Sequence, residues 1–437
     1  MIDMVGIGPF VTAAFVAATM GSAVMALLAW TVGFLICLVD ASVWSELGAR
    51  MPQAGGSYVF LRESYGRDRW GRLMSFLFVW QTTFQAPLVV ASAALGFMKY
   101  STYLVGPLDG GVSRSCAAAL VVLVTFLLYR RIGQIGRISV VLWFCVVATF
   151  LWIIGSGLLF GNVGMALTGS LTFADPETTL WSALAVASIP TMYSFLGYYN
   201  VCHLGAEVRN PERTIPASMY LSILGIGLLY LLYQTSLFSV LTSAEVASSD
   251  FVVSLFVDRL YGSTAAQVAT ALVLIVAVSS LFSLMLGYSR IPYAAARDGV
   301  FFRLFERLHP TENFPHVSLL ILAGIGIVFT LTLTLDDTIK SIITMRVFTQ
   351  FIAQAVGLVI LRRNLGAAAM PWRMWFYPLP ALLAIIAWLW VFSSVSAQKQ
   401  LVGVIAPAAG AVAFLLLAAY RRTWPFTSAE DVSGKGA

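Results

Sequence analysis

Charged residues are scarce in this sequence. Aspartate, glutamate, lysine and arginine together make up 11% of its 437 residues, whereas a typical soluble domain contains about 25%. Apolar residues account for 59%, and the mean hydropathy is +0.87. So few charges exclude an ordinary soluble protein of this length and indicate a polytopic membrane protein.

Potential metal ligands are also few. The chain has four cysteines and three histidines, and it contains no CxxC or HExxH spacing, no P-loop and no hydrolase elbow. The sequence therefore predicts no metal, no cofactor and no enzymatic activity. The cysteines all fall within apolar stretches, so we expect buried thiols rather than disulfides at Cys37, Cys116, Cys145 and Cys202.

Apolar stretches of about 20 residues, the length of a helix that crosses a bilayer, recur along the chain. They predict twelve transmembrane helices, at about 1–20, 22–48, 73–98, 114–131, 138–160, 178–206, 217–240, 265–294, 316–335, 338–361, 374–393 and 400–420. The connections are short, so we expect one membrane domain over about 1–424. Residues 425–437 are small and polar, which predicts a disordered cytoplasmic tail.

The net charge of +6 is distributed unevenly. With the N-terminus placed in the cytoplasm, all but six of the 26 lysines and arginines fall on the cytoplasmic side, as the positive-inside rule describes. The six on the other face are Lys99, Arg114, Arg259, Lys340, Arg346 and Lys399. This asymmetry explains the charge without a nucleic-acid partner. It predicts a multi-pass protein of the cytoplasmic (inner) membrane with both termini inside.

A glycine-containing interruption lies in the first predicted helix. Its sequence is Gly6-Ile7-Gly8-Pro9-Phe10, and Pro9 suits the first turn of a new helix because its missing N–H is not needed there. The N–H groups of Ile7 and Gly8 would then face the gap at the positive end of a helix dipole. That arrangement favours an anion.

A second interruption lies in the sixth predicted helix, within 190–216. Gly197 sits there in an aromatic cluster of Tyr193, Phe195, Tyr198 and Tyr199. Lipid cannot satisfy the backbone groups that a break leaves unpaired, and paired broken helices form the midplane site of many transporters. Each break opens a set of about five helices, which predicts an inverted repeat of five plus five helices. The repeats would cover about 1–160 and 178–362, with two extra helices over 374–420.

Three carboxylates lie within or beside predicted helices. Asp3 is either at a frayed cytoplasmic end or an ionisable group beside the cavity, where acids are often functional. Asp40, deeper in the second helix, is a candidate for a role in transport. Glu46 lies one turn before Arg50, so a structural i,i+4 ion pair at the membrane edge is the alternative to a gating role.

Further candidates for gating or coupling are Trp80, Phe84, Glu207, Ser279, Ser280 and Ser283. Trp80 and Phe84 form an aromatic stripe at helical spacing, which also fits plain packing. The three serines fit either an ion site or the hydrogen bonding that joins membrane helices. Glu207 lies in the polar turn that follows the second break.

Four motifs in this order resemble the amino acid–polyamine–organocation transporter superfamily. They begin at Gly6, Glu46, Phe195 and Ser289 and read GIGPF, EL…PQAGGSY, FLG…EVRNPERTIP and SR…RDG. The resemblance covers nearly the whole chain and is greatest to bacterial amino acid permeases and the L-type exchangers. It implies the fold of the bacterial leucine transporter and transport by alternating access.

The resemblance also implies a substrate site at the two breaks. In relatives the substrate carboxylate takes backbone N–H groups that match Ile7 and Gly8. The amino group takes carbonyls that match Met4, Tyr193 and Leu196, and the Tyr193 ring falls where relatives place an aromatic gate. The predicted substrate-binding residues are Met4, Gly6, Ile7, Gly8, Tyr193, Ser194, Phe195, Leu196, Gly197 and Tyr198.

The sequence thus predicts a secondary active transporter for α-amino acids. No acid lies between Trp181 and Leu204, which favours neutral substrate side chains, with a cationic amino acid or a polyamine as the alternative. The fifth predicted helix lacks the lysine that some proton- or exchange-type relatives carry. Asp3 and Asp40 remain as ionisable groups at depth and favour proton symport or exchange over sodium coupling.

The start of the chain supports a different possibility. Only five residues precede Gly6, too few for a half-helix that reaches the membrane surface at about 1.5 Å per residue. Either the chain begins further upstream or the first half-helix is shortened. A shortened half-helix favours a non-transporting amino acid sensor or a subunit of a complex. The sequence leaves the oligomeric state open.

Overall fold

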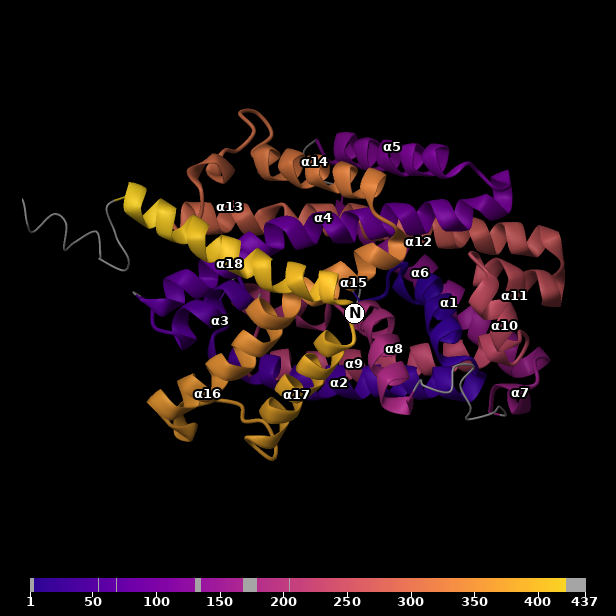
Figure 1. The fold of residues 1–437 in the computed structure, drawn as a ribbon, viewed down its shortest axis with the longest axis horizontal. Coiled ribbons are helices and arrows are strands. Elements are labelled where there is room, and N and C mark those ends of the chain that lie inside the picture. The colour runs from indigo at the N-terminus through magenta and orange to yellow at the C-terminus, as the bar shows by residue number, and fades with distance from the viewer. Residues whose placement is uncertain are drawn as a thin grey trace, which may run out of the picture.

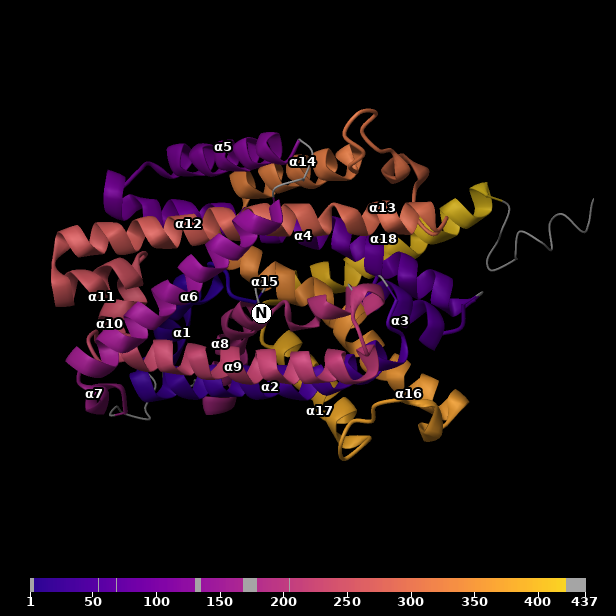
Figure 2. The ribbon, with the colours of Figure 1, turned by 180° about the vertical axis from the view of Figure 1, so that it is seen from behind.

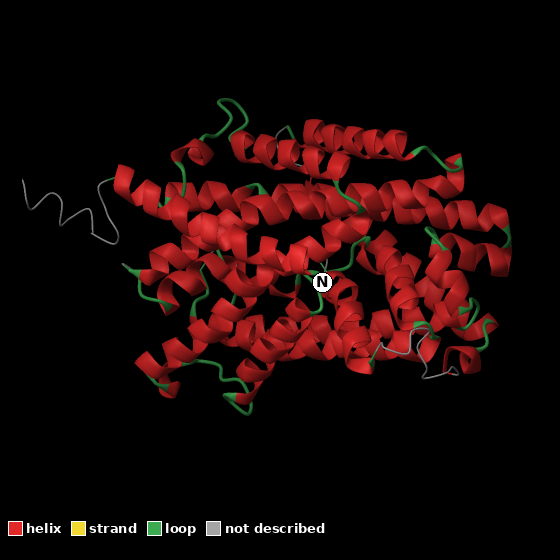
Figure 3. Cartoon of the chain, viewed as in Figure 1, coloured by secondary structure: helices red, strands yellow, loops and turns green. Residues whose placement is uncertain are grey.

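The computed structural model describes residues 4–53, 55–67, 69–129, 135–167, 179–203 and 205–421. These ranges contain helices, turns and loops and no strand, as Figure 3 shows. The prediction of an all-helical chain is confirmed for them. The predicted tail, 425–437, lies outside the described residues.

Seven helical segments are long and apolar enough to cross a membrane. They are α2 (Ala23–Arg50), α4 (Trp70–Val105), α5 (Gly110–Leu128), α9 (Pro211–Phe238), α12 (Ser263–Tyr288) with α13 (Arg290–Arg297), α15 (Leu335–Arg346) with η4 (Val347–Ile352) and α16 (Ala353–Leu365), and α18 (Ala397–Tyr420). The shorter apolar helical stretches are α1 (Gly8–Met20), the part Phe144–Phe160 of α6 (Ile135–Phe160), α8 (Leu180–Phe195), α14 (His316–Thr332) and α17 (Leu379–Ser393). Each coincides with a predicted span, while the count of twelve spans and the inverted repeat stay predictions.

Short helices connect these segments. They are α3 (Ser57–Ser64), α7 (Val163–Leu167), α10 (Ser243–Ser248), α11 (Val252–Tyr261), η1 (Tyr198–His203), η2 (Gly205–Glu207), η3 (Arg303–Glu306) and η5 (Ala367–Ala369). The α11 helix is amphipathic: Val252, Val253 and Phe256 are buried, while Arg259 is exposed. It packs against α12.

The long helices run along the longest axis of the molecule and enclose the broken ones. Figures 1 and 2 show α4, α5, α12 and α14 along one side and the pair α2 and α9 along the other. Between these groups α1 packs against α8, and α15 packs against α4 and α8. The two predicted interruptions therefore lie side by side near the centre of the bundle.

Large apolar side chains cover the outside of the bundle. Examples are Phe126 on α5, Leu389 on α17 and Leu416 on α18, which are 60%, 44% and 67% exposed. Water-soluble monomers rarely expose apolar surface of this extent. Together with the apolar spans, this outward-facing surface fits a multi-pass membrane protein.

The cysteines only partly follow the prediction. Cys37 and Cys202 are buried, whereas Cys145 is half-buried and Cys116 is exposed. The prediction of a buried thiol was wrong for Cys116, because that residue lies on the outer face of α5. An apolar sequence cannot by itself distinguish a helix face that meets protein from one that meets lipid.

Glu46 forms an ion pair that links distant parts of the chain. Both of its carboxylate oxygens contact the Arg362 guanidinium, with Oε2 accepting from Nη2 at 2.6 Å and from the Met374 backbone N–H at 2.9 Å. The expected partner Arg50 is exposed instead. A salt bridge is present, but it joins α2 to α16 and to the turn before α17 rather than two positions of one helix.

We predict that Glu46→Gln lowers the stability of the protein by about 3–5 kcal/mol, because it leaves the buried Arg362 charge without a counter-ion. Thermal unfolding of the purified protein in detergent measures this. Asp250→Asn is the control, since Lys99 and Asp250 form an exposed pair worth about 1 kcal/mol or less. Equal stability of the two variants would contradict the prediction.

Candidate functional site

A cavity of about 60 Å³ lies where α1 begins and α8 ends. Its lining comes from both breaks and from α4, α12 and α15: Met4, Gly6, Ile7, Gly8, Val89, Tyr193, Ser194, Leu196, Gly197, Tyr199, Asn200, Ser280, Leu284, Tyr288 and Arg346. The space suffices for a few water molecules. Sequence segments almost two hundred residues apart thus meet at one site.

At the first predicted break, α1 begins where the sequence predicts the start of a new helix. Residues before Gly8 follow a turn, and α1 begins at Gly8 with Pro9 in its first turn. A Cβ on Gly8 would lie 3.2 Å from the Ser194 Cα, and one on Gly6 would lie 2.7 Å from the Ser280 Oγ. Close packing against α8 and α12 therefore favours glycine at both positions.

The second break is sharper than an ordinary helix end. Helix α8 stops at Phe195, Leu196 is extended, and Gly197 has a φ of 112°, which side chains strongly disfavour. The chain then continues as the 3₁₀ helix η1 rather than as an α-helix. Backbone groups of residues 193–197 therefore leave the regular hydrogen-bond pattern of the α-helix, and they do so beside the cavity.

Tyr230 of α9 joins the two breaks. Its buried hydroxyl lies 2.7 Å from the Met4 carbonyl oxygen and 3.3 Å from that of Ser194. Thr12 and Ser194 form a second link between α1 and α8, at 2.8 Å. The Met4 carbonyl therefore already accepts one hydrogen bond and retains one lone pair. Sequence reasoning missed Tyr230, because a tyrosine in an apolar helix carries no local signal of this contact.

Most predicted substrate-binding residues line the cavity, and two do not. Phe195 is fully buried against the rings of Trp30 and Tyr230. Tyr198 points its hydroxyl at Asp40. The remaining eight line the cavity: Met4, Gly6, Ile7, Gly8, Tyr193, Ser194, Leu196 and Gly197. The Tyr193 hydroxyl also pairs with the Ser92 hydroxyl of α4 at 2.8 Å.

Asp40 is a fully buried carboxylate next to the second break. It accepts hydrogen bonds from Trp44 Nε1 at 2.8 Å, from Trp388 Nε1 at 3.0 Å and from the Tyr198 hydroxyl. These donors come from α2, α17 and η1. The carboxylate does not line the cavity, but its hydrogen bond fixes the position of Tyr198. The next residue, Tyr199, lines the cavity.

The other gating and coupling candidates are dispersed. Ser280 lines the cavity, whereas Ser279 and Ser283 do not. Trp80 donates to the Ala406 carbonyl of α18 at 3.0 Å and packs on Phe84. Glu46 is the ion-pair residue described above, Glu207 is exposed, and Asp3 lies outside the described residues.

Arg346 is the functional candidate that sequence reasoning misplaced. The charge pattern assigned it to the outer face, but it is 1% exposed and lines the cavity. Its guanidinium donates to the Tyr199 hydroxyl and, at 2.7 Å, to the Tyr288 hydroxyl. That assignment was wrong, because α15 and α16 form one continuous span and Arg346 lies in its interior.

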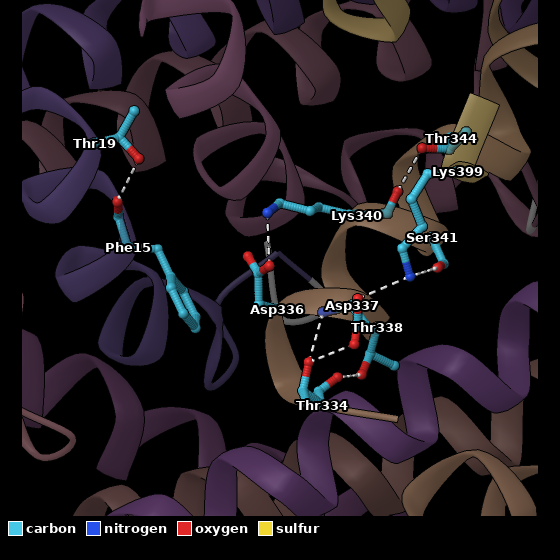
Figure 4. Close-up of polar contacts among 10 residues, drawn as sticks. All are labelled: Phe15, Thr19, Thr334, Asp336, Asp337, Thr338, Lys340, Ser341, Thr344 and Lys399. Carbon is cyan, nitrogen blue, oxygen red and sulfur yellow. Dashed lines mark hydrogen bonds and ion pairs between the residues drawn. The ribbon is translucent and has the colours of Figure 1, made fainter. Parts of the chain in front are cut away.

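Helix α15 is held in place at the end away from Arg346, as Figure 4 shows. Thr334 caps its first turn by accepting from the Asp337 N–H at 3.1 Å. Asp337 also pairs with Lys399 of α18 at 2.9 Å, and Asp336 pairs with Lys340 at 2.6 Å. Both acids at the start of α15 therefore have lysine partners of their own.

Comparison with known proteins identifies the family. A family model described as amino acid permease matches residues 1–419. The chain belongs to this family. The amino acid permease match spans both breaks, the cavity and nearly all the described helices.

Curated members of related transporter groups align over most of the chain. The human cystine/glutamate transporter is 25% identical over 389 residues, which cover 87% of this chain and 75% of that protein. The serine/threonine exchanger of Bacillus subtilis is 22% identical over 403 residues, 90% of this chain and 87% of that protein. The human Asc-type amino acid transporter 1 is 26% identical over 431 residues, 95% of this chain and 79% of that protein.

Gly197→Leu should abolish substrate binding while membrane insertion persists. A side chain at a φ of 112° is strained and would enter the cavity between the breaks. Binding of a labelled amino acid to the purified variant, with its yield in the membrane fraction, measures both effects.

The matched control for this variant is Gly366→Leu, which carries similar backbone strain at a φ of 79° but has nothing within 4 Å of an added Cβ. It should bind normally. Wild-type binding by Gly197→Leu would place the site elsewhere.

Proposed function

We propose that the protein is a secondary active transporter that moves α-amino acids across the cytoplasmic membrane by alternating access. The observation that carries this proposal is the meeting of the start of α1 and the end of α8 at one cavity, where the sequence predicts the two helix breaks. Membership of the amino acid permease family supports it. The positive-inside pattern supports cytoplasmic termini.

The breaks offer groups for both ends of an amino acid. The N–H groups of Ile7 and Gly8 lie at the N-terminus of α1, where the helix dipole favours the substrate carboxylate. The carbonyls of Met4, Tyr193 and Leu196 are the proposed acceptors for the ammonium group. Met4 shares its oxygen with Tyr230, which orients the carbonyl and leaves one lone pair.

The cavity disfavours a positively charged substrate side chain. Among the described residues that line it there is no aspartate or glutamate, and Arg346 adds a cation. A cationic amino acid or a polyamine would meet repulsion without a counter-charge. We therefore propose substrates whose side chain is neutral or negatively charged, and not cationic ones.

Exchange or proton symport is the proposed coupling. One of the related proteins supports exchange by its name, the serine/threonine exchanger. Of the three serines considered for sodium, only Ser280 lines the cavity. Sodium-binding sites need several oxygen ligands together, so the dispersal of these serines favours the other two modes.

Purified protein in liposomes loaded with a mixture of unlabelled amino acids should accumulate at least one labelled amino acid from outside. Protein-free liposomes and liposomes with Gly197→Leu are the controls. Labelled arginine and spermidine should not accumulate. Absence of flux with every amino acid would overturn the proposed function.

The coupling mode is tested with Asp3→Asn. If Asp3 carries the coupled proton, this variant should retain counterflow of labelled amino acid but lose accumulation driven by an inward proton gradient. Uptake measured with and without the proton gradient, at constant sodium, distinguishes counterflow from accumulation driven by the gradient. A wild-type protein that requires sodium and ignores the proton gradient would contradict proton coupling and exchange together.

A further inference from the structure

Arg346 places a guanidinium in the membrane interior at unusual cost. Its side chain is almost completely buried, at 1% exposed, and a buried charge is costly unless a counter-charge and hydrogen bonds accompany it. Arginines inside membrane spans are rare and usually functional. The question is therefore what balances this charge.

No carboxylate of the described residues lies within 4.0 Å of the Arg346 guanidinium. Its contacts are two phenols, Tyr199 and Tyr288, and its Nε has no hydrogen-bond partner there. The Tyr199 ring centre lies 5.6 Å from the guanidinium carbon. These neutral groups orient the cation without neutralising it.

The buried and nearby acids are engaged elsewhere. Asp40 accepts from three other side chains. Asp336 and Asp337 pair with Lys340 and Lys399. These two acids lie about 14 Å along α15 from Arg346, at about 1.5 Å per residue. The charge of Arg346 therefore faces the cavity without a counter-ion from the described part of the chain.

The helical geometry directs Arg346 toward the cavity. It is the last residue of α15, directly before the π-helical segment η4. Such wide turns are rare and occur frequently at functional sites. Tyr288 of α12 and Tyr199 of η1 hold the guanidinium from two sides, and both also line the cavity.

We propose that Arg346 binds a negatively charged group on the substrate side chain, so that the transported amino acids are acidic. This inference rests on the proposed function, in which the α-carboxylate occupies the N-terminus of α1. Arg346 is then a second anion site in the same cavity. A dicarboxylic amino acid such as glutamate or aspartate carries one ammonium and two carboxylates and matches both sites together with the carbonyls. Its net charge of −1 neutralises the arginine.

Glutamate and glutamine, and aspartate and asparagine, are matched pairs of nearly equal size, so they isolate the side-chain charge. Competition against labelled substrate in liposomes that contain wild-type protein measures each apparent affinity. We expect each acid to compete more strongly than its amide by about tenfold or more, which corresponds to about 1.4 kcal/mol.

The variant Arg346→Gln should reverse this order. It removes the cation but retains hydrogen-bond donors, so transport of the acid should fall by about tenfold or more while that of the amide is retained or rises. Arg346→Lys should keep part of the preference, because lysine carries the charge without the two-pronged geometry. Lys340→Gln, on the same helix and paired with Asp336, is the control and should leave the preference unchanged.

The outcomes separate the inference from the proposed function. Absence of flux with every amino acid overturns the proposed function itself. Transport in which amides or apolar amino acids compete as well as the acids overturns only the acidic subsite. That result includes the case in which Asp3 neutralises Arg346, since wild-type protein would then show no preference for acids. An acid preference that survives in Arg346→Gln would also overturn the assignment.

Discussion

Backbone groups that a helix break releases inside an apolar bundle must find hydrogen-bond partners, and the centre of this protein is organised by that requirement. Tyr230 meets part of it, because one phenol reaches carbonyls of both breaks. The link between Thr12 and Ser194 then holds the two broken helices together. The groups left over face one small cavity. The same interruption that weakens the helices thus leaves polar backbone groups beside this cavity, and a small zwitterion is the kind of ligand that such groups suit.

Three of the buried charges in the described residues are stabilised in three different ways. Glu46 has a direct counter-ion in Arg362 and a backbone donor as well. Asp40 has no cation partner in the described part of the chain and relies on three neutral donors. Among the residues that the structure describes, Arg346 has only phenol oxygens as partners, and it lines the cavity. A charge whose partners are complete stabilises the structure, whereas one whose counter-charge is missing is available to a ligand. Glu46 has a counter-ion among the described residues and Arg346 has none, and this difference distinguishes the structural role of Glu46 from the role proposed for Arg346.

Much of this architecture could be predicted from the sequence, because it depends on local signals. Apolar runs locate the helices, and Gly8 with Pro9 and Gly197 locate the breaks. Contacts between distant segments could not be predicted in the same way. The i,i+4 rule pointed Glu46 to Arg50, but the real partner is more than three hundred residues away. Arg346 was assigned to the surface because charge counting treats every arginine as water-facing, while helix continuity through 335–365 places it inside. Phe195 and Tyr198 lie in the right stretch, but Phe195 packs against Trp30 and Tyr230 and the Tyr198 hydroxyl pairs with Asp40. These contacts between distant segments carry no local signal.

The π-helical segment Val347–Ile352 has a consequence for how this chain compares with others. A π turn closes its hydrogen bond over five residues instead of four, so it holds one residue more than an α turn. Residues on either side of it are therefore rotated relative to an uninterrupted helix. A transporter with a regular helix in this place would align correctly only with a one-residue gap, and without that gap every later position would be shifted to a different face of the helix. Residue matches that ignore this gap would pair the cavity-facing positions of one protein with the packed positions of the other.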